Sequence, residues 1–228
     1  MFDYLKCKYV SKLARFFSKG ADSNVWLSRQ LSDPYVKRSR IESFRCRSAF
    51  KLIELDTKYK LLYPGITVLD CGAAPGSWSQ VISRKCFVTN SASSLAIAID
   101  KNFFQPIEHI ICLSECDINS DSTISLMKEK LGTRKFNLVL SDMAPNASGI
   151  KDIDKHTMNQ LNQMALKVAI ENSCKGASFL FKMWSDMNSE KHLKDLILRF
   201  YKSVKIVKPP ASRSDSSEIF LLCQGFGE

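Results

Sequence analysis

The first chemistry-bearing feature of this sequence is a loop that contains two glycines and a proline. It runs from Asp70 to Gln80 (DCGAAPGSWSQ), follows the apolar run at 66–71 and leads into a predicted helix. In open α/β sheets, ligands bind outside the carboxyl ends of the strands. Gly72 and Gly76 let the main chain approach a ligand closely, because they carry no side chain. The loop therefore predicts a cofactor site at the end of the first strand.

The same loop differs from one that binds a dinucleotide. It does not read Gly-x-Gly-x-x-Gly, and Pro75 stands where such a loop starts its helix, which disfavours a nicotinamide cofactor. The next apolar run ends at Asp100, where an acid is positioned to hold ribose hydroxyls, although an aspartate at a strand end also caps turns. Asp117 follows the third run, and we expect it near the adenine edge of a nucleoside. Together these residues favour a nucleoside-containing cofactor.

The rest of the chain alternates apolar runs with helical patterns. Nearly continuous apolar runs predict strands that are covered on both faces, as in a parallel α/β sheet. The last two runs are separated only by a loop, so they predict an antiparallel hairpin at the end of the sheet. Residues 33–60 predict a helical segment before the sheet. The predicted strands lie at 66–71, 95–99, 110–113, 138–140, 177–183, 204–207 and 219–223, and the predicted helices at 77–84, 121–131, 155–172 and 188–201.

Several separated motifs resemble those of the FtsJ/RrmJ family of ribosomal RNA 2′-O-methyltransferases. The loop Asp70-Cys-Gly-Ala-Ala-Pro-Gly and the segment Ser141-Asp-Met-Ala-Pro-Asn carry the resemblance, which spans residues 34–226. It implies a Rossmann-like methyltransferase fold that binds S-adenosylmethionine, and with its basic leader the chain is similar to mitochondrial members of the family. Three further segments agree in order and spacing: 44–55 (FRCRSAFKLIEL), 179–184 (FLFKMW) and 208–222 (KPPASRSDSSEIFLL).

The resemblance also implies the residues of the site. The family has a catalytic tetrad of two lysines and two acids, and motif matching carries it onto Lys51, Asp142, Lys182 and Glu218. The cofactor-binding residues implied by the same matching are Asp70, Gly72, Ala73, Pro75, Gly76, Trp78, Asp100, Asp117 and Asp142.

A lysine-containing tetrad suits methyl transfer to a hydroxyl group. The transfer from a sulfonium is an in-line displacement, and a ribose 2′-hydroxyl is a poor nucleophile until its proton leaves. A neutral lysine can accept that proton, and burial together with a second nearby ammonium disfavours the charged form. Lys182 lies within an apolar run. The resemblance makes Lys182 the base and gives Lys51, Asp142 and Glu218 orienting roles; from the residues alone, two ordinary buried salt bridges are the competing interpretation.

Positive charge is concentrated at the beginning of the chain. The formal net charge is +10, and residues 1–51 carry 12 Lys or Arg against 4 Asp or Glu. Such a segment suits an anionic polymer, an anionic membrane or an import receptor, and a solvated surface is the plain alternative. Aromatic residues Tyr35, Phe44 and Trp184 would stack on bases or pack in the core. The residues expected to contact RNA phosphates are Lys37, Arg38, Arg40, Arg45, Arg47, Lys208 and Arg213.

The first twenty residues predict a basic amphipathic helix with only one acidic residue, Asp3. This pattern is typical of a mitochondrial transit peptide, and an RNA-contacting helix is the alternative. We therefore expect a leader at 1–30, a single methyltransferase domain at 31–228 and a location in the mitochondrial matrix.

Cysteine usage and hydropathy narrow the class of protein further. The eight cysteines form no Cys-x-x-Cys pair and follow no secretory signal, which favours a reducing compartment. His109, Cys112 and Cys116 lack a fourth ligand, so we expect no metal. Apolar runs stay short of the ~18 residues of a membrane span, so we expect no span.

The expected activity is methyl transfer to a ribose 2′-hydroxyl, on a uridine of mitochondrial large-subunit ribosomal RNA. The expected partner is that RNA or a pre-ribosomal large subunit. Two alternatives remain from the sequence: a transfer-RNA or cap ribose methyltransferase with the same tetrad, and an RNA-binding ribosome-assembly factor without activity.

Overall fold

The computed structural model describes residues 28–87, 93–146, 148–185 and 193–227 of the chain. They belong to two compact units, which divide between Ser43 and Phe44. The predicted leader lies outside the described residues except for 28–30, which are helical. The boundary at residue 30 therefore stays a prediction.

The described part of the first unit contains one capped helix, α3 (Pro34–Ile41). The carboxylate of Asp33 accepts hydrogen bonds from the main-chain amides of Tyr35 and Val36 and so caps the first turn of the helix. Pro34 opens the helix, where its missing amide costs nothing.

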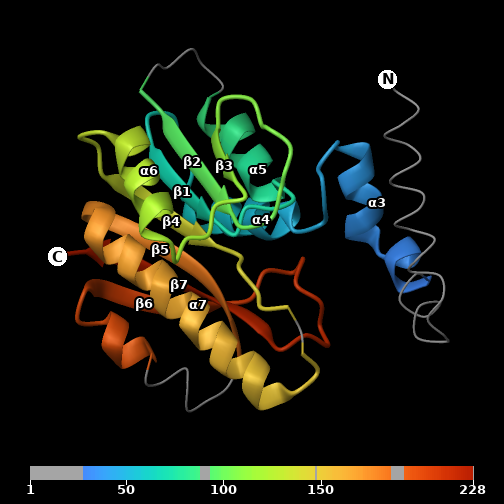
Figure 1. The fold of residues 1–228 in the computed structure, drawn as a ribbon. Helices are drawn as coiled ribbons and strands as arrows, with labels where there is room; N and C mark the ends of the chain where they lie inside the picture. Colours follow the sequence, from blue (N-terminus) through green and yellow to red (C-terminus); the bar gives the residue numbers. More distant parts are fainter. Residues whose placement is uncertain (1–27, 88–92, 147, 186–192, 228) are drawn as a thin grey trace. The chain divides into compact units, whose positions relative to one another are not determined.

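The second unit is built on a seven-stranded sheet with the order β3-β2-β1-β4-β5-β7-β6 (Figure 1). Neighbouring strands from β3 to β5 are parallel, while β7 runs antiparallel to both β5 and β6. The predicted α/β sheet with a terminal antiparallel hairpin is therefore confirmed, and the last strand of the chain inserts between β5 and β6. The strands are β1 (Thr67–Cys71), β2 (Leu95–Asp100), β3 (Ile111–Ser114), β4 (Phe136–Ser141), β5 (Ser173–Trp184), β6 (Tyr201–Val207) and β7 (Glu218–Phe226).

Helices cover both faces of this sheet. In Figure 1, α6 and α7 lie in front of the strands, and α4 and α5 lie behind them. Since successive side chains of a strand point to opposite faces, each buried strand needs apolar residues on both sides. The helices are α4 (Ala49–Tyr59), α5 (Ser77–Cys86), α6 (Asp121–Leu131) and α7 (Lys151–Asn172).

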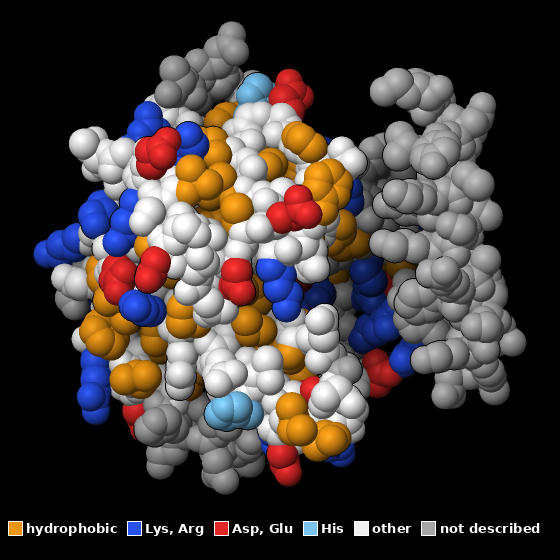
Figure 2. All heavy atoms as spheres, viewed as in Figure 1, with side chains coloured by type: hydrophobic (Ala, Val, Ile, Leu, Met, Phe, Trp, Pro, Cys, Tyr) orange, Lys and Arg blue, Asp and Glu red, His pale blue; other side chains and the backbone are white. Residues whose placement is uncertain are grey.

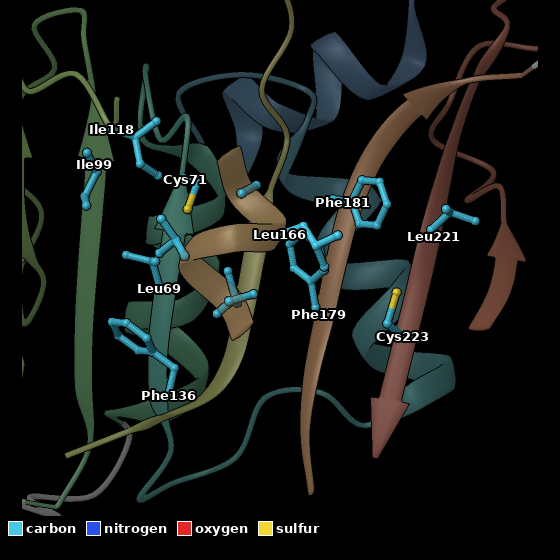
Figure 3. Packing of buried hydrophobic residues seen from close by; sticks show 14 of the residues in the cluster. Leu69, Cys71, Ile99, Ile118, Phe136, Leu166, Phe179, Phe181, Leu221 and Cys223 are labelled. Carbon is cyan, nitrogen blue, oxygen red and sulfur yellow. The ribbon is translucent and has the colours of Figure 1, made fainter. Parts of the chain in front are cut away.

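The main hydrophobic cluster fills the face that carries α6 and α7 (Figure 3). Phe179 and Phe181 of β5 stack there at 4.6 Å between ring centroids, beside Leu166 of α7. Met183 belongs to the same cluster. Lys182 lies between Phe181 and Met183 in sequence, so the pleat of β5 directs it to the opposite face. The apolar strand β5 therefore places Lys182 on the side of the sheet that carries α4.

One predicted helix is wrong at its end. The pattern at 188–201 predicted a helix as far as Tyr201, but among the described residues it is helical only at 193–197. Tyr201 begins β6 and is 2% exposed, and its ring packs against Phe226 of β7 at 5.2 Å between centroids. Pairing with β7 buries this ring, and that tertiary contact outweighs the local helical pattern. None of the helices in the described ranges is long and apolar enough to cross a bilayer.

Candidate active site

Four charged side chains, from α4, β5, β7 and the loop after β4, meet at the carboxyl edge of the parallel strands. The Nζ of Lys182 in β5 lies 2.9 Å from Oδ1 of Asp142 and donates a hydrogen bond to the main-chain carbonyl of Asp142 at 2.6 Å. The Nζ of Lys51 in α4 lies 2.7 Å from the carboxylate of Glu218 and 3.9 Å from Oδ1 of Asp142. Lysine and acid alternate along this charge-balanced chain, which we call the tetrad: Lys182, Asp142, Lys51 and Glu218.

Strand pairing fixes which of these residues meet. The parallel register of β4 and β5 sets Ser141 beside Phe181, so the residues that follow each of them, Asp142 and Lys182, come together. In the antiparallel pair of β5 and β7, Trp184 lies opposite Glu218. Opposed residues of an antiparallel pair point to the same face, and residues two apart share a face. Lys182 and Glu218 therefore project from the same side of the sheet.

An aromatic floor lies under the tetrad. Phe220 is fully buried and pairs with Lys182 across β5 and β7. The Nζ of Lys51 lies 5.7 Å from the centroid of the Phe220 ring, and the indole of Trp78 in α5 lies 5.8 Å from it. The ring thus excludes water from beneath Lys51 while its face attracts the cation.

The central acid of the tetrad is Asp142, whose side chain is 17% exposed. Burial acts to raise its pKa, but the ammonium groups of Lys182 and Lys51 and the hydroxyl of Ser48 act against burial and together lower the pKa. Asp142 is therefore a carboxylate at neutral pH, and this negative charge stabilises two ammonium groups in fixed positions. Lys182 itself is 7% exposed.

Two serines that the sequence analysis missed brace the two acids. The hydroxyl of Ser48 lies 2.5 Å from Oδ2 of Asp142, and the hydroxyl of Ser212 lies 2.7 Å from Oε1 of Glu218. Ser48 precedes Lys51 by three residues, the spacing that puts two residues on one side of a helix. That spacing was the available signal for Ser48. Ser212 had none, because its contact depends on how the loop before β7 folds back.

A cavity of about 280 Å³ adjoins the tetrad at Asp142. It lies at the carboxyl ends of β1, β2 and β4, where Gly72, Asp100 and Asp142 follow or end those strands. Asp117 is the fourth predicted cofactor residue that lines the cavity. Its Oδ1 accepts hydrogen bonds from the main-chain amide and the side-chain amide of Asn119. The lining residues that the sequence analysis did not assign to the cofactor site are Ala74, Ile99, Lys101, Asn102, Cys116, Ile118, Asn119, Met143, Ala144 and Leu161.

The other predicted cofactor residues shape the loop and do not line this cavity. Asp70 is 1% exposed, and its Oδ2 accepts a hydrogen bond from the hydroxyl of Ser79 at 2.6 Å. The indole nitrogen of Trp78 donates to the main-chain carbonyl of Ser48 at 2.9 Å, which ties α5 to α4. The remaining residues of this kind, none of which lines the cavity, are Ala73, Pro75 and Gly76.

Gly72 packs against Met143, the residue that follows Asp142 of the tetrad. Its φ is +76°, a region that residues with a side chain rarely adopt. A Cβ at this position would overlap Cγ of Met143 and lie 3.1 Å from its Cα. Since Met143 follows Asp142 directly, any side chain at Gly72 displaces the segment that carries the central acid.

The predicted RNA-contacting residues fall into two groups. Lys37, Arg38 and Arg40 lie in α3 of the first unit, where Arg38 forms an ion pair with Glu42. The others belong to the second unit and already contact the protein, as the following hydrogen bonds show. Arg45 donates to the carbonyls of Pro75, Gln105 and Pro106, Arg47 to that of Ala211, and Lys208 to that of Ser216, and Arg213 is half-buried.

On the side of the sheet that carries α6 and α7, surface charges of both signs are mixed. Figure 2 shows Lys and Arg interspersed with Asp, Glu and hydrophobic side chains on the face that carries α6 and α7. Phe44, one of the aromatic residues considered for base stacking, is 8% exposed and packs edge-on against Phe50.

In the described parts of the chain, no group of three or more His, Cys, Asp or Glu is arranged to hold a metal ion.

The buried carboxyl of Asp70 predicts a pH-dependent stability. Burial raises its pKa to about 7, and the hydrogen bond from Ser79 only partly opposes this. Between pH 4 and 7 the unfolded chain releases this proton while the folded chain keeps it, so Asp70 lowers stability as the pH rises through that window. In Asp70→Asn, which mimics the protonated acid, the urea midpoint should fall less between pH 5 and pH 8 than in the wild type. Equal falls in the two proteins would contradict the assignment.

Comparison with known proteins gives the family. Residues 44–226 match the sequence family described as FtsJ-like methyltransferase. The chain is 41% identical over 224 residues to "rRNA methyltransferase 2, mitochondrial" of Drosophila melanogaster, which covers 96% of this chain and 89% of that protein. It is 38% identical over 204 residues to "Ribosomal RNA large subunit methyltransferase E" of Anaplasma phagocytophilum. This alignment covers 90% of this chain and 81% of that protein.

A solved structure agrees with these sequence relatives. It comes from Plasmodium falciparum, is named for ribosomal RNA methyltransferase activity, and superimposes with a TM-score of 0.70 at 31% identity, covering 80% of this chain and 98% of that one. The family match covers nearly all of the second unit, including the loop, the cavity and the tetrad. The chain therefore belongs to the FtsJ-like family and is an S-adenosylmethionine-dependent methyltransferase.

Proposed function

We propose that this enzyme methylates a ribose 2′-hydroxyl of large-subunit ribosomal RNA, with Lys182 as the base. The observation that carries the proposal is the junction at Asp142, where a buried chain of two lysines and two acids meets a cavity suited to a nucleoside. The names of the Drosophila and Anaplasma relatives support ribosomal RNA as the substrate.

The residues around the cavity fit S-adenosylmethionine. Asp100 is buried at the end of β2, and its two carboxylate oxygens are held by the amide of Ala74 and by Asn102. A carboxylate fixed in this way is suited to accept the ribose hydroxyls of the cofactor. Asp117 stands beyond β3, where the amino group of the adenine would meet it, and the close approach at Gly72 leaves room for the methionine portion. When bound, the cofactor supplies an electrophilic methyl group.

Within the tetrad each residue has a separate task. In its neutral form Lys182 takes the proton of the 2′-hydroxyl. Its nitrogen lies at the end of the tetrad, where it pairs with one acid, Asp142, which lines the cavity, rather than between two acids. Asp142 holds that nitrogen in place through both its carboxylate and its carbonyl oxygen. Lys51 pairs with Asp142 from the other side, and Glu218 in turn pairs with Lys51 and balances its charge. A base fixed in this way loses little entropy when the hydroxyl arrives.

We further propose that the target is a uridine of mitochondrial ribosomal RNA. Two observations support this location: the Drosophila relative is named as mitochondrial, and residues 1–30 have the basic, acid-poor pattern of a transit peptide. The RNA or a pre-ribosomal large subunit would be the physiological partner.

The cofactor assignment predicts the effect of a single methyl group. Gly72→Ala should weaken binding of S-adenosylmethionine by at least tenfold, because the new Cβ overlaps Met143 and because φ is positive at this position. Isothermal calorimetry with the purified chain measures this directly. Gly132→Ala is a matched control, since Gly132 also has a positive φ (+62°) but a Cβ there meets nothing within 4 Å. Equal losses in both variants would assign the effect to backbone strain alone.

The base assignment predicts that arginine does not replace lysine. Lys182→Ala and Lys182→Arg should both lose methyl transfer by about 10²–10⁴-fold, the usual contribution of a general base. A guanidinium keeps its proton at any working pH but can still pair with Asp142. Single-turnover transfer from labelled S-adenosylmethionine to saturating ribosomal RNA isolates the chemical step. If Lys182→Arg keeps more than about a tenth of the rate, the tetrad only positions the substrate and the proton leaves to water.

The choice of target predicts one missing modification in cells. Deletion of this chain should remove a uridine 2′-O-methyl group from mitochondrial large-subunit ribosomal RNA, and re-expression of Lys182→Ala should not restore it. Mapping of ribose methylation across all cellular RNA measures both results. Loss from transfer RNA or a cap would identify the alternative substrates. Full rescue of ribosome assembly by Lys182→Ala would identify an assembly factor whose methylation is dispensable.

A further inference from the structure

Arg45 lies just before α4 and spans two loops of the molecule. Its Nη1 donates hydrogen bonds to the carbonyls of Pro75 at 2.8 Å and Gln105 at 2.7 Å, and its Nη2 donates to the carbonyl of Pro106 at 2.9 Å. Pro75 belongs to the loop after β1, whereas Gln105 and Pro106 belong to the loop after β2. A single guanidinium thus connects segments that are thirty residues apart in the sequence.

The loop after β1 is shaped around this side chain. A Cβ at Gly76 would lie 2.5 Å from Nη1 of Arg45 and 2.6 Å from Ile107, so only glycine leaves room for the guanidinium. The main-chain amide of Arg45 donates to Oε1 of Gln80 in α5 at 2.8 Å, which fixes the residue from a second direction. Arg45 is therefore held at both its main chain and its side chain.

Both loops tied by Arg45 also line the cofactor cavity. Ala74, which precedes Pro75, lines one wall, and Lys101 and Asn102, which begin the second loop, line another. The carboxylate of Asp100 already joins these walls on the inside through the amide of Ala74 at 2.9 Å. Arg45 joins the same two loops a few residues further along each of them.

We propose that Arg45 is a positioning residue of the cofactor site, which holds the two walls at the separation that S-adenosylmethionine requires. This role replaces the phosphate contact expected from the sequence, because three of the donors of Arg45 are already used on main-chain carbonyls. The proposal rests on the assignment of this cavity to the cofactor. A planar fork is needed for the task, since a lysine ammonium is a point donor and does not span three carbonyls on two loops.

Calorimetry and RNA binding together test the proposal. In Arg45→Ala the dissociation constant for S-adenosylmethionine should rise about tenfold or more, and Arg45→Lys should not restore it. The single-turnover rate at saturating cofactor should stay within a few-fold of the wild-type rate, because the tetrad is untouched. The dependence of RNA affinity on salt should also keep its slope, whereas the loss of a phosphate contact lowers that slope by about one.

A matched control is Arg134→Ala, which removes another arginine bonded to a carbonyl, that of Ser93, away from the cavity. Its cofactor affinity should equal that of the wild type. Unchanged cofactor affinity in Arg45→Ala, or a lowered salt slope as its only defect, would overturn the proposal. If the wild-type chain itself bound no S-adenosylmethionine, the cavity assignment would fail instead. Thermal unfolding of each variant identifies loss of fold, and Arg45→Lys then serves as the milder substitution.

Discussion

Burial of the Asp142 carboxylate between two ammonium groups is the interaction on which the site depends. A carboxylate in a buried position is costly unless it is paired, and removing one partner of such a group typically costs several kcal/mol. Asp142 meets this cost with Lys182, Lys51 and Ser48, whose combined effect lowers its pKa despite burial. These partners come from β5 and from the segment at the start of α4. The charge on one residue therefore constrains how a strand and a helix must be placed.

This constraint explains how the apolar core and the catalytic site coexist in the same strand. β5 presents Phe179, Phe181 and Met183 to the cluster under α7, and it presents Lys182 to the opposite face. Burial on the first face anchors the strand, and it thereby holds the lysine nitrogen at a fixed distance from Asp142. A more polar environment on the core face would loosen the strand and with it the proposed base, Lys182. The high apolar content around Lys182 thus serves the position of the lysine as well as its burial.

The segment at 45–48 connects several parts of the site. Three of its residues contact different parts of the site: Arg45 joins two loops, Arg47 holds the carbonyl of Ala211, and Ser48 braces Asp142. Trp78 in turn donates to the carbonyl of Ser48. This short segment before Lys51 therefore connects the loop after β1, the tetrad and the loop that leads to Glu218. This arrangement explains why basic residues in the segment are bonded to carbonyls within the protein.

The sequence by itself determined the strands, their parallel arrangement and the family. Continuous apolar runs predict buried strands because both faces must be covered, and the motifs around Asp70 and Asp142 are specific enough to indicate a methyltransferase. Only the tertiary structure decided which polar groups meet. Ser212 reaches Glu218, Arg45 reaches three carbonyls, and Tyr201 leaves a helical pattern to pair with β7. Local sequence patterns indicate which residues are buried, but they do not indicate which distant residue each polar group contacts. Those contacts depend on strand register and on how the loops close.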